Sequence, residues 1–246
     1  MLAHLKNHPF DVEAFFEYSL VLTYAIPQEE LQTLIPECLK LDTFQGKWAF
    51  VAIAFVQTKA LRPKGLPAFM GNDFFLIGYR IFVQYTTNLG KRLRGLYILK
   101  SETDSRRMEL LGSLFSRYQY TTIDINQILQ GAILQITSKK SGLDVVVNIS
   151  SQNRSLPFTS PFSNWQEARR YAGPLPFTFS YNPETREVLI VEGIREHWQP
   201  TPVQVLRADS IFFDSFNLPT PILASAFIIK DIPYQWKRGR TEQWNR

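Results

Sequence analysis

Hydrophobic and aromatic residues recur mostly in short runs bounded by Gly, Pro, Asn or Asp, which is the pattern of β-strands joined by turns. The stretches around residues 45–47 and 86–91 each predict a hairpin, because a glycine there accepts a positive φ. Residues 123–137 stay ambiguous between element types. The expected strands cover residues 15–24, 39–44, 48–57, 73–85, 94–100, 142–149, 177–181, 188–192, 197–206, 211–213 and 222–230.

Helical spacing of apolar residues appears in only a few places. Residues 28–35 follow a proline and carry an acidic pair in the first turn, which suits a helix N-terminus. Residues 104–115 repeat apolar positions at helical spacing, with Asp104 or Ser105 available as the N-cap, and residues 164–171 predict a shorter helix. The pattern therefore predicts a mainly β (α+β) protein, with a closed or nearly closed antiparallel sheet and a few helices packed outside it.

Length and composition favour one domain. The chain has 246 residues, of which 45% are hydrophobic and 20% charged, so it has enough apolar surface for a sizeable core. We find no internal repeat and no Pro-, Gly- or Ser-rich linker that would divide it. We therefore expect a single domain over residues 1–246, with frayed tails at 1–12 and 240–246.

Charge and cysteine content limit the classes of ligand and partner that the sequence predicts. The formal charge is +5, but Lys and Arg are scattered without a long basic block, so the sequence carries no strong nucleic-acid signal. One cysteine and the lack of zinc-ligand spacing predict neither a metal nor another cofactor. Without a secretory signal or a long apolar run, a cytoplasmic protein with no membrane span is expected. The frequency of two-fold dimers among soluble proteins allows for a homodimer.

Several stretches together resemble an uncharacterised domain-of-unknown-function family of the acetoacetate decarboxylase-like superfamily. The resemblance covers residues 18–240, and its motifs carry no known chemistry of their own. The stretches are IPECLKLDTFQGKWAFVAIAF, LRPKGLP, YRIFVQY followed by GLYILKSETD, and the C-terminal FNLPTPILASAFIIKDIPYQWKRGR.

The resemblance implies a β-barrel-like fold with an apolar internal pocket and, in the decarboxylase, a Schiff-base lysine in that pocket. The corresponding stretch here, residues 112–121, contains no lysine and places Tyr120 at the position of the nucleophile. Tyrosine cannot form an imine. Whether the chain is an enzyme stays open, but we do not expect a lysine Schiff-base decarboxylase.

Five residues are candidates for a ligand site, each with a structural alternative. Arg80 is a cation in an apolar strand and could clamp a carboxylate, or it could face solvent. Tyr118 and Tyr120 lie two apart, so both could donate to a ligand from one face or pack as core rings. Asp104 could act in the site or only cap a helix, and His197 could bind a ligand or be structural.

These residues support a first hypothesis, in which a small carbonyl- or carboxylate-containing molecule binds in an internal pocket lined by Arg80, Tyr118 and Tyr120. The alternative is a non-catalytic protein-interaction domain that uses exposed aromatics and the basic tail at residues 236–240. A third hypothesis is nucleic-acid contact through the basic surface, which predicts strongly salt-dependent binding.

Overall fold

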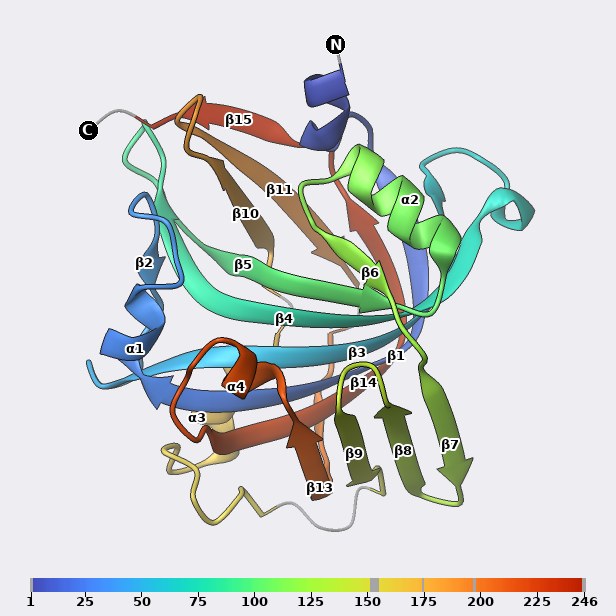
Figure 1. Cartoon of the computed structure of the whole chain (residues 1–246), viewed down its shortest axis with the longest axis vertical. Coiled ribbons are helices and arrows are strands. Elements are labelled where there is room, and N and C mark those ends of the chain that lie inside the picture. The colour runs from blue at the N-terminus through green and yellow to red at the C-terminus, as the bar shows by residue number, and fades with distance from the viewer. Residues whose placement is uncertain (1, 151–154, 174, 197, 245–246) are drawn as a thin grey trace.

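A computed structural model describes residues 2–150, 155–173, 175–196 and 198–244. Within these residues, the larger of two sheets has eleven strands (Figure 1). Nine of them form its main path, and two short strands, β2 (Lys40–Leu41) and β6 (Tyr120–Thr122), add to β4 and β5. The path runs, in order, through β12 (Thr201–Pro202), β14 (Ile222–Trp236), β1 (Val12–Pro27), β3 (Trp48–Pro63), β4 (Asn72–Thr86), β5 (Arg92–Thr103), β10 (Phe177–Asn182), β11 (Glu187–Arg195) and β15 (Arg240–Gln243).

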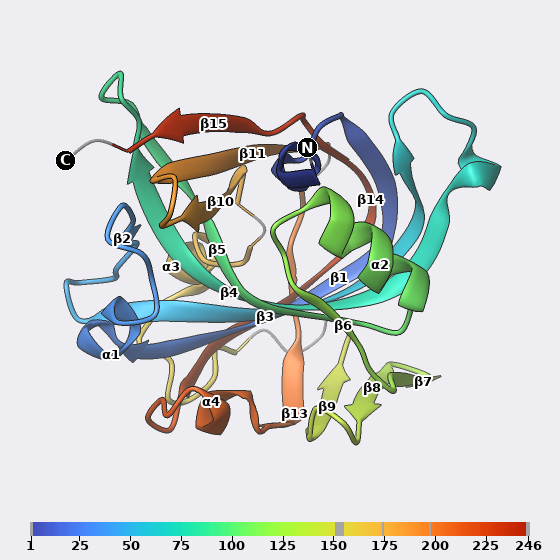
Figure 2. The ribbon, with the colours of Figure 1, turned by 45° about the horizontal axis from the view of Figure 1, so that its top comes forward.

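The larger sheet closes on itself. β11 also pairs with β14, with Gly193 opposite Trp236 and Arg195 opposite Tyr234, so the strands from β14 to β11 form a ring (Figure 2). The pairing of β5 with β10 and with β6 is parallel, which corrects the expectation of a purely antiparallel sheet. A long connection separates β5 from β10, and parallel pairing requires such a crossover.

A second sheet of four antiparallel strands lies beside the ring, at the bottom of Figure 1. Its order is β13 (Gln204–Ser210), β9 (Leu143–Asn148), β8 (Ile133–Ser138) and β7 (Asn126–Gln130). The ambiguous stretch of the sequence thus forms β7 and β8. The strand expected at 197–206 is instead divided between β12 and β13, and its first residue falls outside the described part of the chain.

The helices are short and lie outside the ring. They are the 3-10 helices η1 (Leu2–Asn7) and η2 (Ala68–Met70) and the α-helices α1 (Gln28–Gln32), α2 (Arg106–Phe115), α3 (Trp165–Arg169) and α4 (Phe212–Ser215). The N-cap of α2 is Ser105, whose side chain accepts a hydrogen bond from the Met108 amide.

The strand expected at 211–213 is wrong, because these residues begin α4. The Ser210 hydroxyl accepts from the Phe212 amide at 3.2 Å and so favours a turn at this point. Phe212 stacks on Tyr79 with ring centroids 4.2 Å apart, and Phe213 packs against Tyr24. Two consecutive buried aromatics fit a buried strand and a single helical turn equally well in sequence.

Both segments that were expected to fray are packed against the domain where they are described. Residues 2–7 form η1, and the next residue, His8, donates its amide to the carbonyl of Phe115 at 3.2 Å. Residues 240–243 form β15, which pairs with β11. Both figures place η1 beside α2 at one end of the ring. The N-terminal segment therefore lies against α2 at the end of the ring, next to the ring interior.

Side chains alternate between the two faces of β4. Phe75, Ile77 and Tyr79 belong to the apolar cluster shared with the second sheet and α4. The intervening positions, including Leu76 and Arg80, face the interior of the ring. This alternation brings a charged residue of an otherwise apolar strand into the interior.

Candidate functional site

A cavity of about 490 Å³ lies inside the ring. Its walls come from β1, β3, β4, β5, β6, β10 and β14. They are completed by α2, residues 8–10, Met70 of η2 and the loop residues Ser116, Tyr118 and Leu175. Most lining side chains are apolar, and the described lining residues include no Asp, Glu or Lys. A mostly apolar concave site with a few polar groups is the usual form of a small-molecule site.

Arg80 contributes a cation to this cavity without a protein partner. Its Nε atom is buried and makes no hydrogen bond, and no described group forms an ion pair with the guanidinium. Burial lowers the pKa of Arg80, and the groups that act against this effect are the phenols of Tyr234, Tyr120 and Tyr118 rather than a carboxylate. An arginine nevertheless stays protonated at neutral pH. The cavity therefore holds a charge that the described protein groups do not neutralise.

Gly78 makes room for the guanidinium. A Cβ atom at this position would lie 2.7 Å from the Nε of Arg80 and 2.9 Å from its Nη2, which is closer than real contacts allow. The Arg80 side chain thus folds back over Gly78, along its own strand. This placement depends on a glycine two residues before the arginine.

Three tyrosines surround the same region of the cavity. Tyr118 and Tyr120 lie with ring centroids 6.4 Å apart in an edge-on arrangement, and Tyr234 approaches from β14. Burial raises the pKa of Tyr120 to about 12 and also raises the pKa values of Tyr118 and Tyr234. All three phenols therefore stay protonated at neutral pH and can donate hydrogen bonds.

Two further glycines make room for two of these rings. A Cβ at Gly112 would lie 2.4 Å from the ring of Tyr120, and one at Gly193 would lie 2.1 Å from the hydroxyl oxygen of Tyr234. Neither Tyr234 nor these glycines are among the candidates predicted from the sequence. The alternation of large residues along the end of β14 could have indicated that Tyr234 faces inward, but not toward which residue.

The remaining candidates lie elsewhere. Asp104 is exposed, lies outside the cavity lining and accepts a hydrogen bond from the Phe75 amide at 2.8 Å. Asp104 is therefore not the N-cap of α2, and it does not line the cavity that contains Arg80. His197 falls outside the described residues. The structure thus brings Arg80, Tyr118 and Tyr120 together, and their role in binding stays a prediction.

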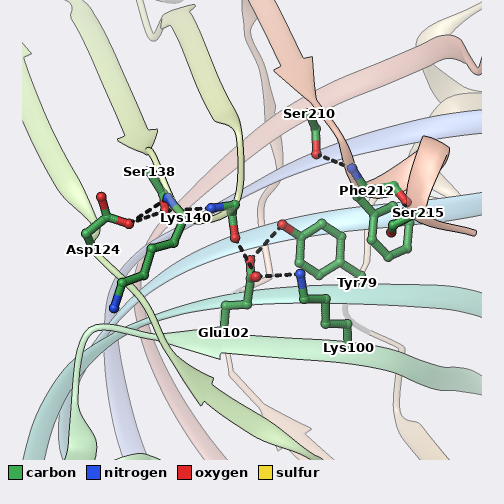
Figure 3. A network of polar contacts seen from close by, with 10 residues as sticks. Tyr79, Lys100, Glu102, Asp124, Ser138, Lys140, Ser210, Phe212 and Ser215 are labelled. Atoms are coloured by element: carbon green, nitrogen blue, oxygen red, sulfur yellow. Dashed lines mark hydrogen bonds and ion pairs between the residues drawn. The ribbon is translucent and has the colours of Figure 1, made fainter.

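A second buried charge, Glu102, differs from Arg80 because its partners are all present (Figure 3). Glu102 is 2% exposed and accepts hydrogen bonds from the Tyr79 hydroxyl at 2.8 Å and from the Ser141 hydroxyl. Lys100 forms an ion pair with it at 2.6 Å, as expected for a lysine beside a carboxylate. Ser141 comes from the turn between β8 and β9, so this cluster joins the second sheet to the ring.

The described residues contain no group of three or more His, Cys, Asp or Glu side chains placed to hold a metal ion. No helix among them is long and apolar enough to cross a membrane.

Comparisons with known proteins identify the fold. The model of the DUF2071 family, described as an uncharacterized conserved protein, matches residues 15–238. No curated protein sequence matches the chain.

Solved structures of the acetoacetate decarboxylase-like kind superimpose over almost the whole chain. The acetoacetate decarboxylase of Legionella pneumophila has a TM-score of 0.59 at 11% identity, covering 95% of this chain and 88% of that one. An acetoacetate decarboxylase-like enzyme from Sphingomonas wittichii RW1 has a TM-score of 0.58 at 11% identity, with coverages of 98% and 94%. The enduracididine biosynthesis enzyme MppR, complexed with pyruvate, has a TM-score of 0.59 at 10% identity, with coverages of 96% and 92%. The mainly β, acetoacetate decarboxylase-like fold expected from the sequence is confirmed.

Proposed function

This chain belongs to the DUF2071 family and has the acetoacetate decarboxylase-like fold, and we propose that it binds a small carbonyl- or carboxylate-containing molecule inside its ring of strands. Arg80 is the anchor for the anionic or carbonyl oxygen. Tyr118, Tyr120 and Tyr234 surround this position with neutral hydrogen-bond donors.

The unpartnered guanidinium of Arg80 is the observation that carries the proposal. Taking a charge out of water costs several kcal/mol unless another group compensates it. A carboxylate ligand would supply that compensation, because its two oxygens match the planar fork of a guanidinium in a bidentate pair. The buried cluster around Glu102, by contrast, contains its own counter-charge, Lys100.

The solved relatives support the same chemical class. MppR holds pyruvate, which is a small keto acid, and the decarboxylases are named for acetoacetate. Imine chemistry on a lysine does not extend to this chain, because the described residues of its cavity include no lysine. The proposal is therefore for binding.

The alternative of a basic docking tail finds little support. Lys237 pairs with Glu192 at 2.9 Å, and the Arg238 amide donates to Asp11 at 2.7 Å. Trp236 packs against the ring of Phe16 and lines the cavity. The tail is thus folded onto the ring with part of its charge paired, and Lys237 and Arg238 lie exposed on its surface.

Isothermal titration with pyruvate and acetoacetate tests the proposal. We expect saturable binding to the wild-type protein and a loss of about ten- to hundredfold in affinity for Arg80→Gln, since a hydrogen bond to a charged group is lost. Arg106→Gln, which removes an exposed arginine from α2, is the matched control and should leave the affinity unchanged. Equal affinity in the wild type and Arg80→Gln would refute Arg80 as the anchor.

A further inference from the structure

We infer that the preferred ligand is an amphiphile, a straight-chain monocarboxylate with a chain of about eight to twelve carbons. Its carboxylate lies on Arg80 and its chain follows β4 toward the opening of the cavity. This inference rests on the proposed function and adds the size, polarity and orientation of the ligand.

The volume of the cavity exceeds what a small keto acid needs. A water molecule occupies about 30 Å³ in the liquid, and one non-hydrogen atom of an organic ligand takes a similar share. The cavity of about 490 Å³ therefore has room for roughly sixteen such atoms. Pyruvate would fill less than half of it. The remaining space must hold either water or an apolar chain.

Most of the lining between the cation and the start of β4 is apolar, and its polar exceptions are Thr58 and Asn72, which each have a buried polar atom without a hydrogen-bond partner. From Arg80 back toward the start of β4, the same strand face presents Gly78, Leu76 and Phe74. Leu111 and Phe115 of α2 line the cavity as well. An alkyl chain gains free energy by displacing water from such a surface. The charged end and the apolar wall thus match the two parts of a fatty acid.

The opening lies at the far end of this wall. Three lining residues are exposed: Pro63 at the end of β3, Met70 just before β4, and Arg107 on the first turn of α2. From Gly78 to Asn72 the strand advances on the order of 20 Å. The cation therefore lies at the inner end of the cavity, so the ligand enters with its carboxylate first.

The charge balance limits the ligand to one carboxylate. Besides Arg80, the lining arginines are Arg62 and Arg107. Arg62 pairs with Glu13 at 2.6 Å, and Arg107 is exposed at the opening. Only Arg80 is a buried lining arginine that lacks a counter-charge among the described residues, so a second interior carboxylate would be uncompensated.

The test is a chain-length series of saturated carboxylates from butanoate to tetradecanoate, titrated calorimetrically against the wild-type protein. Affinity should rise about three- to fourfold for each added methylene, as for burial of a CH₂ group, and stop rising near ten to twelve carbons. Decanol, which has the chain without the charge, should bind at least about tenfold more weakly than decanoate. Equal binding of decanol and decanoate would overturn the placement of the carboxylate on Arg80.

Two tryptophan variants on α2 locate the chain. Leu111→Trp places a large ring in the cavity and should lower the affinity for decanoate at least about tenfold, and by more than it lowers the affinity for butanoate, since it fills the space of the chain. Leu110→Trp is the matched control, because Leu110 is 70% exposed on the same helix, and it should leave the whole series unchanged. Equal effects of the two variants would contradict the path of the chain.

The outcomes separate this inference from the proposed function. If pyruvate and butanoate bind through Arg80 but affinity does not increase with chain length, the amphiphile is refuted and the small-anion site stands. If no carboxylate of any length binds, both fail. The series on the wild-type protein decides the matter even if a variant does not fold.

Discussion

Replacing Arg80 with methionine should stabilise the folded protein and at the same time weaken its binding of carboxylates. Methionine is unbranched and fills irregular apolar space well, so it can take the path of the arginine stem over Gly78. The substitution removes a buried cation for which the described residues provide no ion pair. In most proteins, by contrast, the removal of a buried charged residue is destabilising, because its partner is left behind.

The expected magnitude follows from the cost of burying a charge. The effective penalty is several kcal/mol per ion, and a cavity of about 490 Å³ can admit water that reduces it. We therefore expect Arg80→Met to raise the free energy of unfolding by about 1–3 kcal/mol. For a chain of this size, 1 kcal/mol corresponds to about 2–4 °C in Tm, so Tm should rise by about 2–12 °C.

Urea and thermal unfolding followed by circular dichroism measure this change, with Arg62→Met as the control. Arg62 also lines the cavity, but it pairs with Glu13 at 2.6 Å and donates to the carbonyls of Leu66 and Ala60 at 2.7 and 2.8 Å. Its replacement should destabilise the protein by about 1–3 kcal/mol. A clear loss of stability in Arg80→Met would show that the guanidinium has a protein partner, and it would contradict the assignment of Arg80 as an uncompensated buried cation.

Three further predictions concern neighbouring features. Gly78→Ala should weaken the binding of butanoate about tenfold or more, because its Cβ displaces the guanidinium of Arg80; unchanged affinity with unchanged circular dichroism would contradict this. Glu102→Ala should lower the free energy of unfolding by about 2–4 kcal/mol, because buried hydroxyls lose their acceptor, and it should leave carboxylate affinity unchanged; a loss of affinity would instead link this cluster to the cavity. Burial lowers the pKa of His8 below its usual 6.5, so the unfolded state binds more protons and the free energy of unfolding should fall as the pH drops below 6.5. His8→Gln should weaken this pH dependence, measured by urea unfolding at several pH values. A pH profile identical to that of the wild type would refute the prediction.

The sequence predicted most strands of the ring and the helix α2, because their apolar periods are long and their ends carry turn residues or a cap. It also indicated Arg80, since a cation in an apolar strand needs an explanation. It could not indicate that β10 pairs in parallel with β5, because that pairing depends on a long connection rather than on local pattern. The turn at Phe212 was also beyond local pattern, for the reason given above.

The rest of the candidate site depends on closure of the ring. Tyr234 reaches the neighbourhood of Arg80 only because β14 pairs with both β1 and β11, which are distant from β4 in sequence. Gly78 and Gly193 likewise have a clear role only once the side chains that they accommodate are known. Spatial neighbours of this kind carry no signature in a single sequence.

The most decisive measurement is a crystal structure of the protein grown with ω-bromodecanoate, because the anomalous signal of bromine locates the chain end independently of the carboxylate. We expect the carboxylate within hydrogen-bonding distance of the Arg80 guanidinium and the bromine near the opening at Met70 and Arg107. A cavity that contains only water, with Arg80 paired to a protein carboxylate or carbonyl, would contradict it.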